Sequence, residues 1–277
     1  MGARREAREA LAAAGLRPRK RWGQHFLCDP AVAHRIVETA EVGPRAVALE
    51  IGPGLGALTE ELAGRAGRLY LVEIDPILAA RLAARYAGNP RVRVIEGDVL
   101  ALPLETLVTG TRVTVIGNLP YNIAIPILFR LREQRVRMPR AVVMVQREVA
   151  ERLTARPGTA DYGVTTVLLQ AVADVRLAFR VSRRSFLPPP RVESAVIDVR
   201  WSVAPRVDLG DEEAFREVVR ASFGQRRKML RNALAALAQR RGVDLELACA
   251  RAGVASSARA ETLDLDAFAR LARALIP

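Results

Sequence analysis

The chain has 277 residues, of which half are hydrophobic, so it can bury a sizeable core and form two domains. Its 43 lysine and arginine residues outnumber its 30 acidic residues, which gives a formal net charge of +13 and a pI near 11.1. Charged residues interrupt every apolar run well before the roughly 20 residues that span a bilayer, so no membrane helix is expected. The excess positive charge favours a polyanionic partner. We expect nucleic acid, with a merely basic surface as the alternative.

The N-terminal residues, the cysteines and the histidines exclude further classes of protein. Residues 1–21 are arginine-rich but contain two glutamates and no long apolar segment, so they are not typical of a signal peptide. The two cysteines lie far apart and there are only two histidines, which predicts neither a disulfide framework nor a metal site. We therefore expect a cytoplasmic protein without a bound metal.

Strand-like and helix-like segments alternate between residues 46 and 146. Short apolar runs predict five strands, over residues 46–52, 68–75, 92–98, 112–117 and 141–146. Helical spacing predicts helices over residues 57–66 and 76–87, the second with Asp75 as its N-cap and Pro76 in its first turn. Such alternation is typical of a mostly parallel sheet that helices cover on both faces, so the predicted fold class is α/β.

The pattern changes in the second half of the chain. Residues 164–179 and 193–201 are predicted as two long strands, separated by the loop 181–192, that form an antiparallel addition at one edge of the sheet. After Pro205 the strand pattern ends, and three segments have helical periodicity: residues 211–222, 226–239 and 264–276. We therefore predict a basic arm over residues 1–25, a Rossmann-like domain over residues 26–204 and a small all-α domain over residues 205–277.

A glycine-rich turn follows the first predicted strand, in the segment LEIGPGLGALT. Gly52, Gly54 and Gly56 allow the backbone to turn sharply and to approach a ligand closely. The spacing is G-x-G-x-G with a proline inside, whereas a dinucleotide-binding turn has G-x-G-x-x-G. With the carboxylate of Glu50 just before it, this stiffer turn suits a cationic or zwitterionic ligand better than a diphosphate.

Acidic residues end the next two predicted strands. Glu73 lies about 20 residues after Gly52, where open α/β folds place an acid that accepts hydrogen bonds from ribose hydroxyls. Asp98 ends the third strand, within reach of an adenine amine. Together with the glycine turn, these acids indicate a nucleoside pocket without phosphate-binding lysines, which fits S-adenosylmethionine. Separately, Glu73 could be a partner of a helix cap and Asp98 a turn residue.

The sequence IGNLPYNI follows the fourth predicted strand and therefore faces the same crevice. The exocyclic amine of adenine is a poor nucleophile, and two acceptors bonded to its hydrogens can orient it and favour charge build-up on nitrogen. The side-chain oxygen of Asn118 and the carbonyl of Leu119 are the candidate acceptors. Pro120 fixes the backbone, and the ring of Tyr121 offers a stacking face for an extruded base. A turn that only packs its tyrosine is the alternative.

Over nearly its whole length the chain resembles the 16S ribosomal-RNA adenine dimethyltransferase family. Eight segments carry the resemblance, in this order: KRWGQHFL (20–27), LEIGPGLGALT (49–59), VEID (72–75), EGDVL (96–100), IGNLPYNI (116–123), QREVAERL (146–153), SFLPPPRVESAV (185–196) and FGQRRKMLRN (223–232). The resemblance implies a Rossmann-like methyltransferase domain with a small helical domain. It also implies methyl transfer from S-adenosylmethionine to two adjacent adenosines near the 3′ end of small-subunit rRNA.

The resemblance also implies roles for individual residues. Six residues would bind the cofactor: His25, Leu27, Gly52, Glu73, Asp98 and Asn118. Asn118, Leu119 and Tyr121 would engage the target amine, with Pro120 in the same catalytic segment, and Phe186 would clamp the base from the other side. The family usually has asparagine where this chain has His25, and a serine–threonine pair where it has Ala124 and Ile125. The segment YGVTTVLLQ (162–170) also departs from the family pattern.

The expected partner is 16S rRNA within a precursor of the small ribosomal subunit. Clusters of basic residues are the candidate RNA contacts, with solvated surfaces as the alternative: Arg19, Lys20, Arg21, Arg183, Arg184, Arg226, Arg227 and Lys228. We expect a monomer. Two other functions stay open from sequence, a 23S rRNA adenine methyltransferase and a ribosome-assembly factor whose docking, rather than turnover, is essential.

Overall fold

The computed structural model describes residues 22–107, 112–225 and 228–276, together with Arg5, Arg8, Glu9, Leu11, Ala12, Gly15 and Pro18. The chain forms two compact units. The first contains Met1–Ala150 and Val175–Trp201, and the second contains Glu151–Asp174 and Ser202–Pro277. Within the described ranges, no helix is both long and apolar enough to cross a bilayer.

Among the described residues, seven strands form the sheet of the first unit, in the order β4-β3-β2-β5-β6-β9-β7. Their bounds are β2 Val47–Ile51, β3 Arg68–Glu73, β4 Val92–Glu96, β5 Val113–Asn118, β6 Arg140–Gln146, β7 Ala173–Val181 and β9 Ser194–Trp201. The strands from β4 to β6 are parallel to their neighbours, and β9 runs antiparallel to β6. The sheet confirms the predicted α/β fold class with its antiparallel edge addition.

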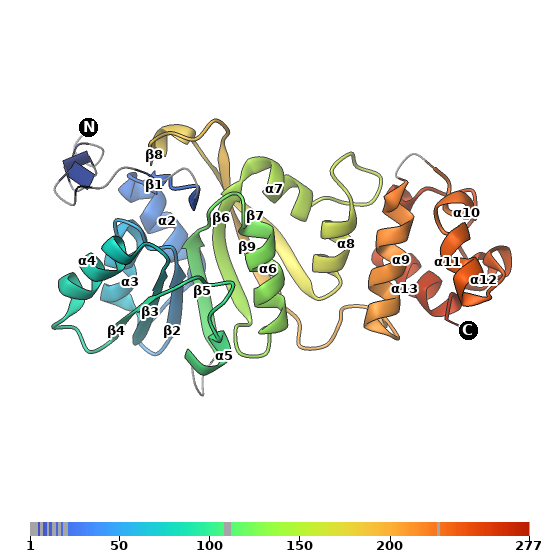
Figure 1. Cartoon of the computed structure of the whole chain (residues 1–277), viewed down its shortest axis with the longest axis horizontal. Coiled ribbons are helices and arrows are strands. Elements are labelled where there is room, and N and C mark those ends of the chain that lie inside the picture. The colour runs from blue at the N-terminus through green and yellow to red at the C-terminus, as the bar shows by residue number, and fades with distance from the viewer. Residues whose placement is uncertain are drawn as a thin grey trace. The chain divides into compact units, whose positions relative to one another are not determined.

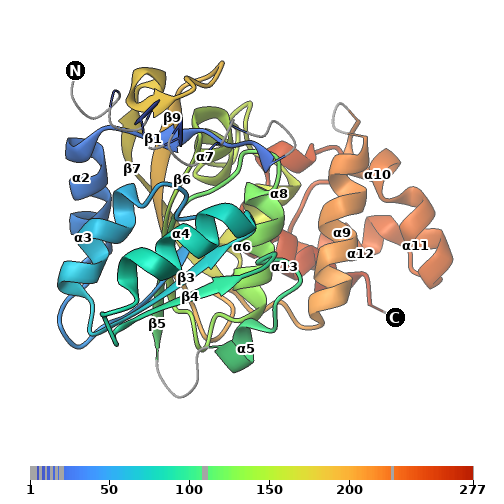
Figure 2. The ribbon, with the colours of Figure 1, turned by 60° about the vertical axis from the view of Figure 1, so that its left-hand side comes forward.

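Helices cover both faces of this sheet. They are α2 (Pro30–Ala40), α3 (Ala57–Arg65), α4 (Pro76–Tyr86), α5 (Leu104–Leu107), α6 (Ala124–Glu133) and α7 (Arg147–Leu153). In Figures 1 and 2, α2 and α3 lie on one side of the sheet and α6 lies on the other. Helix α4 begins as predicted, because the Asp75 carboxylate accepts a hydrogen bond from the Ile77 amide at 3.1 Å and Pro76 occupies the first turn.

The order of strands reverses at β2. From β2 the chain crosses outward to β3 and β4, then returns to β5 and β6 on the opposite side. Such a reversal leaves a crevice at the carboxyl ends of the two central strands, because the connecting helices diverge to opposite faces. The pairs Ile51–Val72 and Ile51–Gly117 bring Gly52, Glu73 and Asn118 to the same end of the sheet.

A two-stranded ribbon lies outside this sheet. It pairs β1 (Phe26–Leu27) with β8 (Phe186–Leu187), antiparallel, with Phe26 opposite Leu187 and Leu27 opposite Phe186. The Cys28 amide extends the pairing by donating to the Ser185 carbonyl at 2.8 Å. The ribbon therefore joins the segments GQHFL and SFLPPP, which are far apart in sequence.

The second unit is helical. Its helices are α8 (Val164–Gln170), α9 (Glu212–Gly224), α10 (Leu230–Ala233), α11 (Ala235–Arg241), α12 (Leu245–Ala252) and α13 (Leu265–Ala274). Helix α13 packs against α9 and α12, and Phe215 and Phe268 are fully buried. The unit also takes residues 151–174, which the sequence analysis placed in the Rossmann-like part. The predicted helices over 211–222 and 264–276 are confirmed by α9 and α13.

Two predicted elements are wrong. Residues 164–170 form helix α8 rather than the start of a strand, and β7 begins only at Ala173. Thr166 to Leu169 are all buried, and a short run buried on every side has no periodicity that distinguishes helix from strand. The single helix predicted over residues 226–239 is instead two short helices, α10 and α11, while residues 226–227 lie outside the described part of the chain.

Candidate active site

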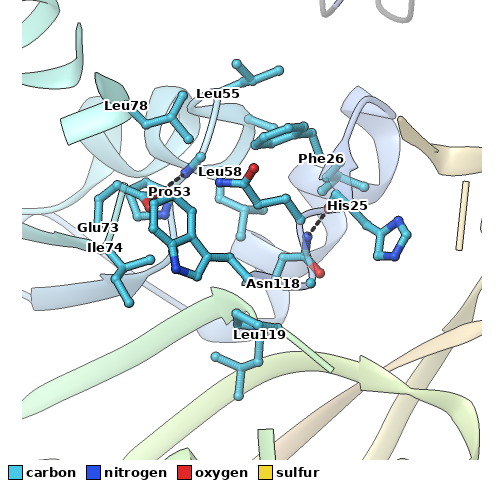
Figure 3. Close-up of a pocket in the computed structure, with 18 of the residues that line it drawn as sticks. His25, Phe26, Pro53, Leu55, Leu58, Glu73, Ile74, Leu78, Asn118 and Leu119 are labelled. Atoms are coloured by element: carbon cyan, nitrogen blue, oxygen red, sulfur yellow. Dashed lines mark hydrogen bonds between the residues drawn. The ribbon is translucent and has the colours of Figure 1, made fainter. Parts of the chain in front are cut away.

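The carboxyl ends of β2, β3 and β5 open into a cavity of about 710 Å³, part of which is open solvent. Most of the site residues predicted from sequence line it: His25, Leu27, Gly52, Glu73, Asn118, Leu119, Pro120 and Tyr121. Glu50 and Gly54 line it as well. Figure 3 shows side chains converging on this space from the glycine turn, from the end of β3 and from the end of β5.

The glycine turn forms the floor of the cavity. Gly52 and Gly54 have φ values of +67° and +57°, in the left-handed region that side chains rarely adopt. The amide of Gly54 donates a hydrogen bond of 2.9 Å to Oε2 of Glu73. A Cβ atom on Gly54 would lie 3.0 Å from the ring of Phe26, so the phenyl group packs directly on the turn. The turn therefore needs glycine for its conformation and for its packing.

The Glu73 carboxylate is buried at the end of β3, and only 4% of the residue is exposed. Besides Gly54, the amide of Asp75 donates to it, at 3.0 Å from Oε1. Burial raises the pKa of Glu73, although backbone hydrogen bonds from Asp75, Gly54 and Ile74 act to lower it. A carboxylate has about four acceptor sites, so Glu73 can still accept from a hydroxyl group in the cavity.

Glu50 lies one strand away and is 1% exposed. Its carboxyl group accepts a hydrogen bond of 2.7 Å from the Thr59 hydroxyl. Burial raises the pKa of Glu50 to about 8, since the Thr59 hydrogen bond compensates for only part of the lost hydration and Glu73 lies nearby. The cavity thus contains two buried carboxyl groups and no described basic side chain other than His25. This composition suits a positively charged or zwitterionic ligand.

Asn118 ends β5 with a defined side-chain orientation. Its Nδ2 donates to the His25 carbonyl at 2.8 Å, which turns Oδ1 away from that contact (Figure 3). The adjacent Leu119 amide donates to the Met144 carbonyl at 3.0 Å and fixes the backbone there. No described residue donates to Asn118 Oδ1 or to the Leu119 carbonyl. Two unused acceptors therefore stand on successive residues beside the cavity.

Tyr121 is held on two sides. Its phenol oxygen lies 2.6 Å from the hydroxyl of buried Ser194, and its ring stacks on the His25 imidazole with centroids 5.6 Å apart. Burial raises the pKa of Tyr121, so the phenol stays protonated near neutral pH. The ring of Tyr121 is thus a fixed platform beside the acceptors of Asn118 and Leu119.

Two predicted site residues do not line the cavity. Phe186 is fully buried among core residues that include Leu27 and Met144, so in this structure its ring has no face open to a base. Asp98 uses Oδ1 to accept from the Leu100 amide at 2.9 Å, as a turn residue does. The roles implied for these two residues stay predictions.

Sequence reasoning missed several residues that line the cavity: Trp22, Gln24, Leu55, Leu58, Ile74 and Leu78. Trp22 lies in the segment KRWGQHFL but carries no site prediction. Ile74 follows Glu73 directly, and that position alone could have indicated an apolar wall beside the acid. The Gln24 amide donates to the Asp75 carboxylate at 3.3 Å, a contact over 51 residues with no local sequence signal.

A parallel sheet that reverses beside a glycine turn, a buried acid at the next strand end and an Asn-Leu-Pro-Tyr segment define a Rossmann-like methyltransferase. Residues 15–276 match the family described as "Ribosomal RNA adenine dimethylase". The chain therefore belongs to the ribosomal RNA adenine dimethylase family. This membership confirms the predicted enzyme class, an S-adenosylmethionine-dependent adenine dimethyltransferase.

Individual relatives agree with this family. A protein from Geobacter sulfurreducens named "Ribosomal RNA small subunit methyltransferase A" is 47% identical over 268 residues, which cover 95% of this chain and 96% of the relative. A solved dimethyladenosine transferase from Plasmodium falciparum has a TM-score of 0.76 at 25% identity, covering 89% of this chain and 96% of that one. The solved 23S rRNA methyltransferase ErmE has a TM-score of 0.69 at 30% identity, covering 90% and 99%.

Proposed function

We propose that this chain dimethylates the exocyclic amines of two adjacent adenosines in the 3′-terminal hairpin of 16S rRNA, within a precursor of the small ribosomal subunit. The observation that carries this proposal is the pair of unused acceptors at Asn118 and Leu119 beside a cavity suited to S-adenosylmethionine. The small-subunit substrate is supported by the printed name of the Geobacter relative. A substrate of this kind would place the activity in the cytoplasm.

The residues of the cavity fit S-adenosylmethionine. The Glu73 carboxylate can accept from a ribose hydroxyl, and Gly52 and Gly54 let the ligand lie against the backbone. The Glu50 carboxyl group, buried on the floor, can pair with the ammonium group of the methionine part. Ile74 and Leu78 supply an apolar wall for the adenine. When bound there, S-adenosylmethionine supplies an electrophilic methyl group on a sulfonium.

The Asn-Leu-Pro-Tyr segment can orient the target amine. Asn118 Oδ1 and the Leu119 carbonyl would each accept one of its two hydrogens, which aims the nitrogen lone pair and stabilises the positive charge that develops on nitrogen. Pro120 fixes the backbone that follows these acceptors. The target base would stack on the Tyr121 face that the His25 imidazole does not cover. A base must leave its own stack to reach this position.

We propose that exposed basic residues contact the RNA. Arg183 and Arg184 are exposed in the turn before β8, and Lys228 is exposed in the second unit. A hollow of about 660 Å³, part of which is open solvent, is lined by Arg147, Arg183 and Arg191. The remaining predicted contacts lie outside the described residues: Arg19, Lys20, Arg21, Arg226 and Arg227.

This arginine hollow lies near the target site. Arg147 directly follows β6, and Asn118 pairs with Met144 in the register of β5 and β6. Two glutamates, Glu148 and Glu193, also line the hollow. The Oε2 atom of Glu193 accepts from the Arg183 amide at 2.9 Å, which fixes the turn. We propose that the hollow holds a phosphate of a nucleotide next to the target adenosine.

Transfer of labelled methyl groups to small-subunit particles, large-subunit particles, naked rRNA and duplex DNA tests this function. We expect label in small-subunit particles. Label in large-subunit RNA instead would favour a 23S rRNA methyltransferase. An Asn118→Ala variant separates catalysis from docking: if the variant supports subunit assembly without methylating RNA, docking is the essential activity.

A further inference from the structure

Ser194 is a buried polar residue at the start of β9. It is fully buried, and the next three residues, Ala195–Ile197, are buried and apolar. A buried hydroxyl group is unfavourable unless it forms a hydrogen bond. Among the described residues, the hydrogen-bond partner of this hydroxyl is the phenol oxygen of Tyr121, at 2.6 Å. An apolar side chain would pack here equally well, so the hydroxyl group indicates a role in holding Tyr121.

The side chain of Tyr121 is held at each end. At the backbone end, the Ile123 amide donates to the Pro120 carbonyl at 3.1 Å and closes the turn around Tyr121. At the hydroxyl end, Ser194 holds the ring from a strand 73 residues away in sequence. Tyr121 is only partly buried, so without this second contact its ring could rotate about the side-chain bonds. The hydrogen bond therefore determines the direction in which the ring face points.

The residue before Ser194 belongs to the arginine hollow. Glu193 lines the hollow, and its carbonyl accepts from the Arg147 amide at 2.9 Å. Its carboxylate accepts from the Arg183 amide, also at 2.9 Å. Two adjacent residues, Glu193 and Ser194, thus connect the proposed phosphate site to the ring of Tyr121.

We infer that Ser194 is a positioning residue for the target adenine. Its hydroxyl group fixes the ring of Tyr121, and its place in the chain sets that ring at a defined position relative to the arginine hollow. This inference rests on the proposed function, in which the base stacks on Tyr121. A base held at the wrong angle does not aim its amine at the methyl carbon, so loss of the Ser194 hydroxyl should slow methyl transfer without weakening RNA binding.

Three variants of the hydroxyl pair test the inference. Ser194→Ala and Tyr121→Phe each remove one hydroxyl group and leave the other without its partner. The double variant removes both, which costs little stability because no unpaired group is left. Ser222→Ala is the matched control: Ser222 is also fully buried, and its hydroxyl donates to the Val218 carbonyl at 2.7 Å within α9 of the second unit.

The first readout is carbon-13 NMR of the protein alone, labelled at the phenol carbon of its four tyrosines. The chemical shift of this carbon responds to hydrogen bonding of the phenol, and the Tyr121 signal is identified by its absence in Tyr121→Phe. Ser194→Ala should move the Tyr121 signal, whereas Ser222→Ala should leave it in place. An unmoved signal in Ser194→Ala would overturn the inference.

The second readout is single-turnover methyl transfer to small-subunit particles at saturating S-adenosylmethionine. The rate constant should fall about fivefold in Ser194→Ala and in Tyr121→Phe, as expected for one lost hydrogen bond, and no further in the double variant. The particle concentration for half-maximal rate should stay within about twofold of the wild type, and Ser222→Ala should match the wild type throughout. A wild-type rate constant in Ser194→Ala, or a loss of about 25-fold in the double variant, would overturn the inference, because the two hydroxyl groups would then not act as a pair.

Melting temperatures distinguish positioning from a contribution to stability. The double variant should melt close to the wild type and still transfer methyl groups slowly. If its rate constant instead returns to that of the wild type, the pair only stabilises the fold and the inference fails.

Failure of the proposed function gives a different result. If the wild-type protein methylates no RNA, the proposed function fails, and the role of Ser194 toward adenine fails with it. The NMR measurement requires no substrate, so it still shows whether Ser194 holds Tyr121. If the wild type methylates small-subunit RNA and Ser194→Ala does so equally fast, only the inference about Ser194 fails.

Discussion

Replacing Gly54 by alanine should weaken cofactor binding as well as destabilise the fold. Gly54 has a φ of +57°, and a Cβ atom would lie 3.0 Å and 3.2 Å from two atoms of the Phe26 ring. The left-handed backbone costs a residue with a side chain about 1–2 kcal/mol. Displacing a buried ring adds about 1–3 kcal/mol, the usual cost of overpacking.

The movement of the displaced Phe26 ring determines whether this free-energy cost affects cofactor binding. Phe26 is 7% exposed and pairs with Leu187, so it can move only into the cavity or by shifting the ribbon. Either movement changes the surface that S-adenosylmethionine would contact. Since each 1.4 kcal/mol is a factor of ten, we expect the dissociation constant for S-adenosylhomocysteine to rise at least about tenfold in Gly54→Ala.

Gly242→Ala is the matched control. Gly242 has a φ of +64°, has no atom within 4 Å of the added Cβ and ends helix α11 in the second unit. The Gly242→Ala substitution should destabilise the protein by about 1–2 kcal/mol, through the same backbone strain, and should leave cofactor binding unchanged. Calorimetric titration and thermal unfolding of both variants measure these effects. Wild-type affinity in Gly54→Ala would refute the placement of the cofactor against the glycine turn.

Three further predictions follow from the site. Asn118→Ala should reduce the rate constant of methyl transfer in single-turnover experiments about 100- to 1,000-fold, because one acceptor for the amine is lost. A reduction under tenfold would contradict that role. Because burial raises the pKa of Glu50 to about 8, its carboxyl group is largely neutral at pH 7 and becomes a carboxylate above pH 8. Affinity for the ammonium of S-adenosylhomocysteine should therefore rise between pH 6.5 and 8.5 in titrations, and Glu50→Gln should remove this rise. Arg183→Ala and Arg191→Ala should each lower the slope of log K against log salt for RNA binding by about one, measured by fluorescence anisotropy, whereas unchanged slopes would exclude phosphate contacts there.

The central part of the fold could be predicted from sequence because each element has a local signal. The five parallel strands are short apolar runs that end in glycine, acidic or amide residues, and α4 has its cap and its proline. Helix α8 lacks such a signal, since it is buried on nearly every side. The β1–β8 ribbon pairs two-residue strands across about 160 residues, and nothing in either segment specifies the other.

The candidate site was also predictable only in part. Gly52, Glu73 and Asn118 lie at the carboxyl ends of three neighbouring strands of a parallel sheet, so their convergence follows from topology. The partners of His25 do not, because its contacts with Pro188 and Tyr121 depend on how three distant segments pack. Burial of Phe186 is likewise a tertiary property, invisible in a segment that carries its family motif intact.

Mass spectrometry of digested small-subunit rRNA, after reaction of undermethylated particles with this protein and labelled S-adenosylmethionine, tests the proposed function most directly. We expect dimethyladenosine at two adjacent positions of the 3′-terminal hairpin, and far less of it after the same reaction time with Asn118→Ala. Label confined to large-subunit RNA, or no label from a protein that binds S-adenosylhomocysteine, would contradict the proposed function.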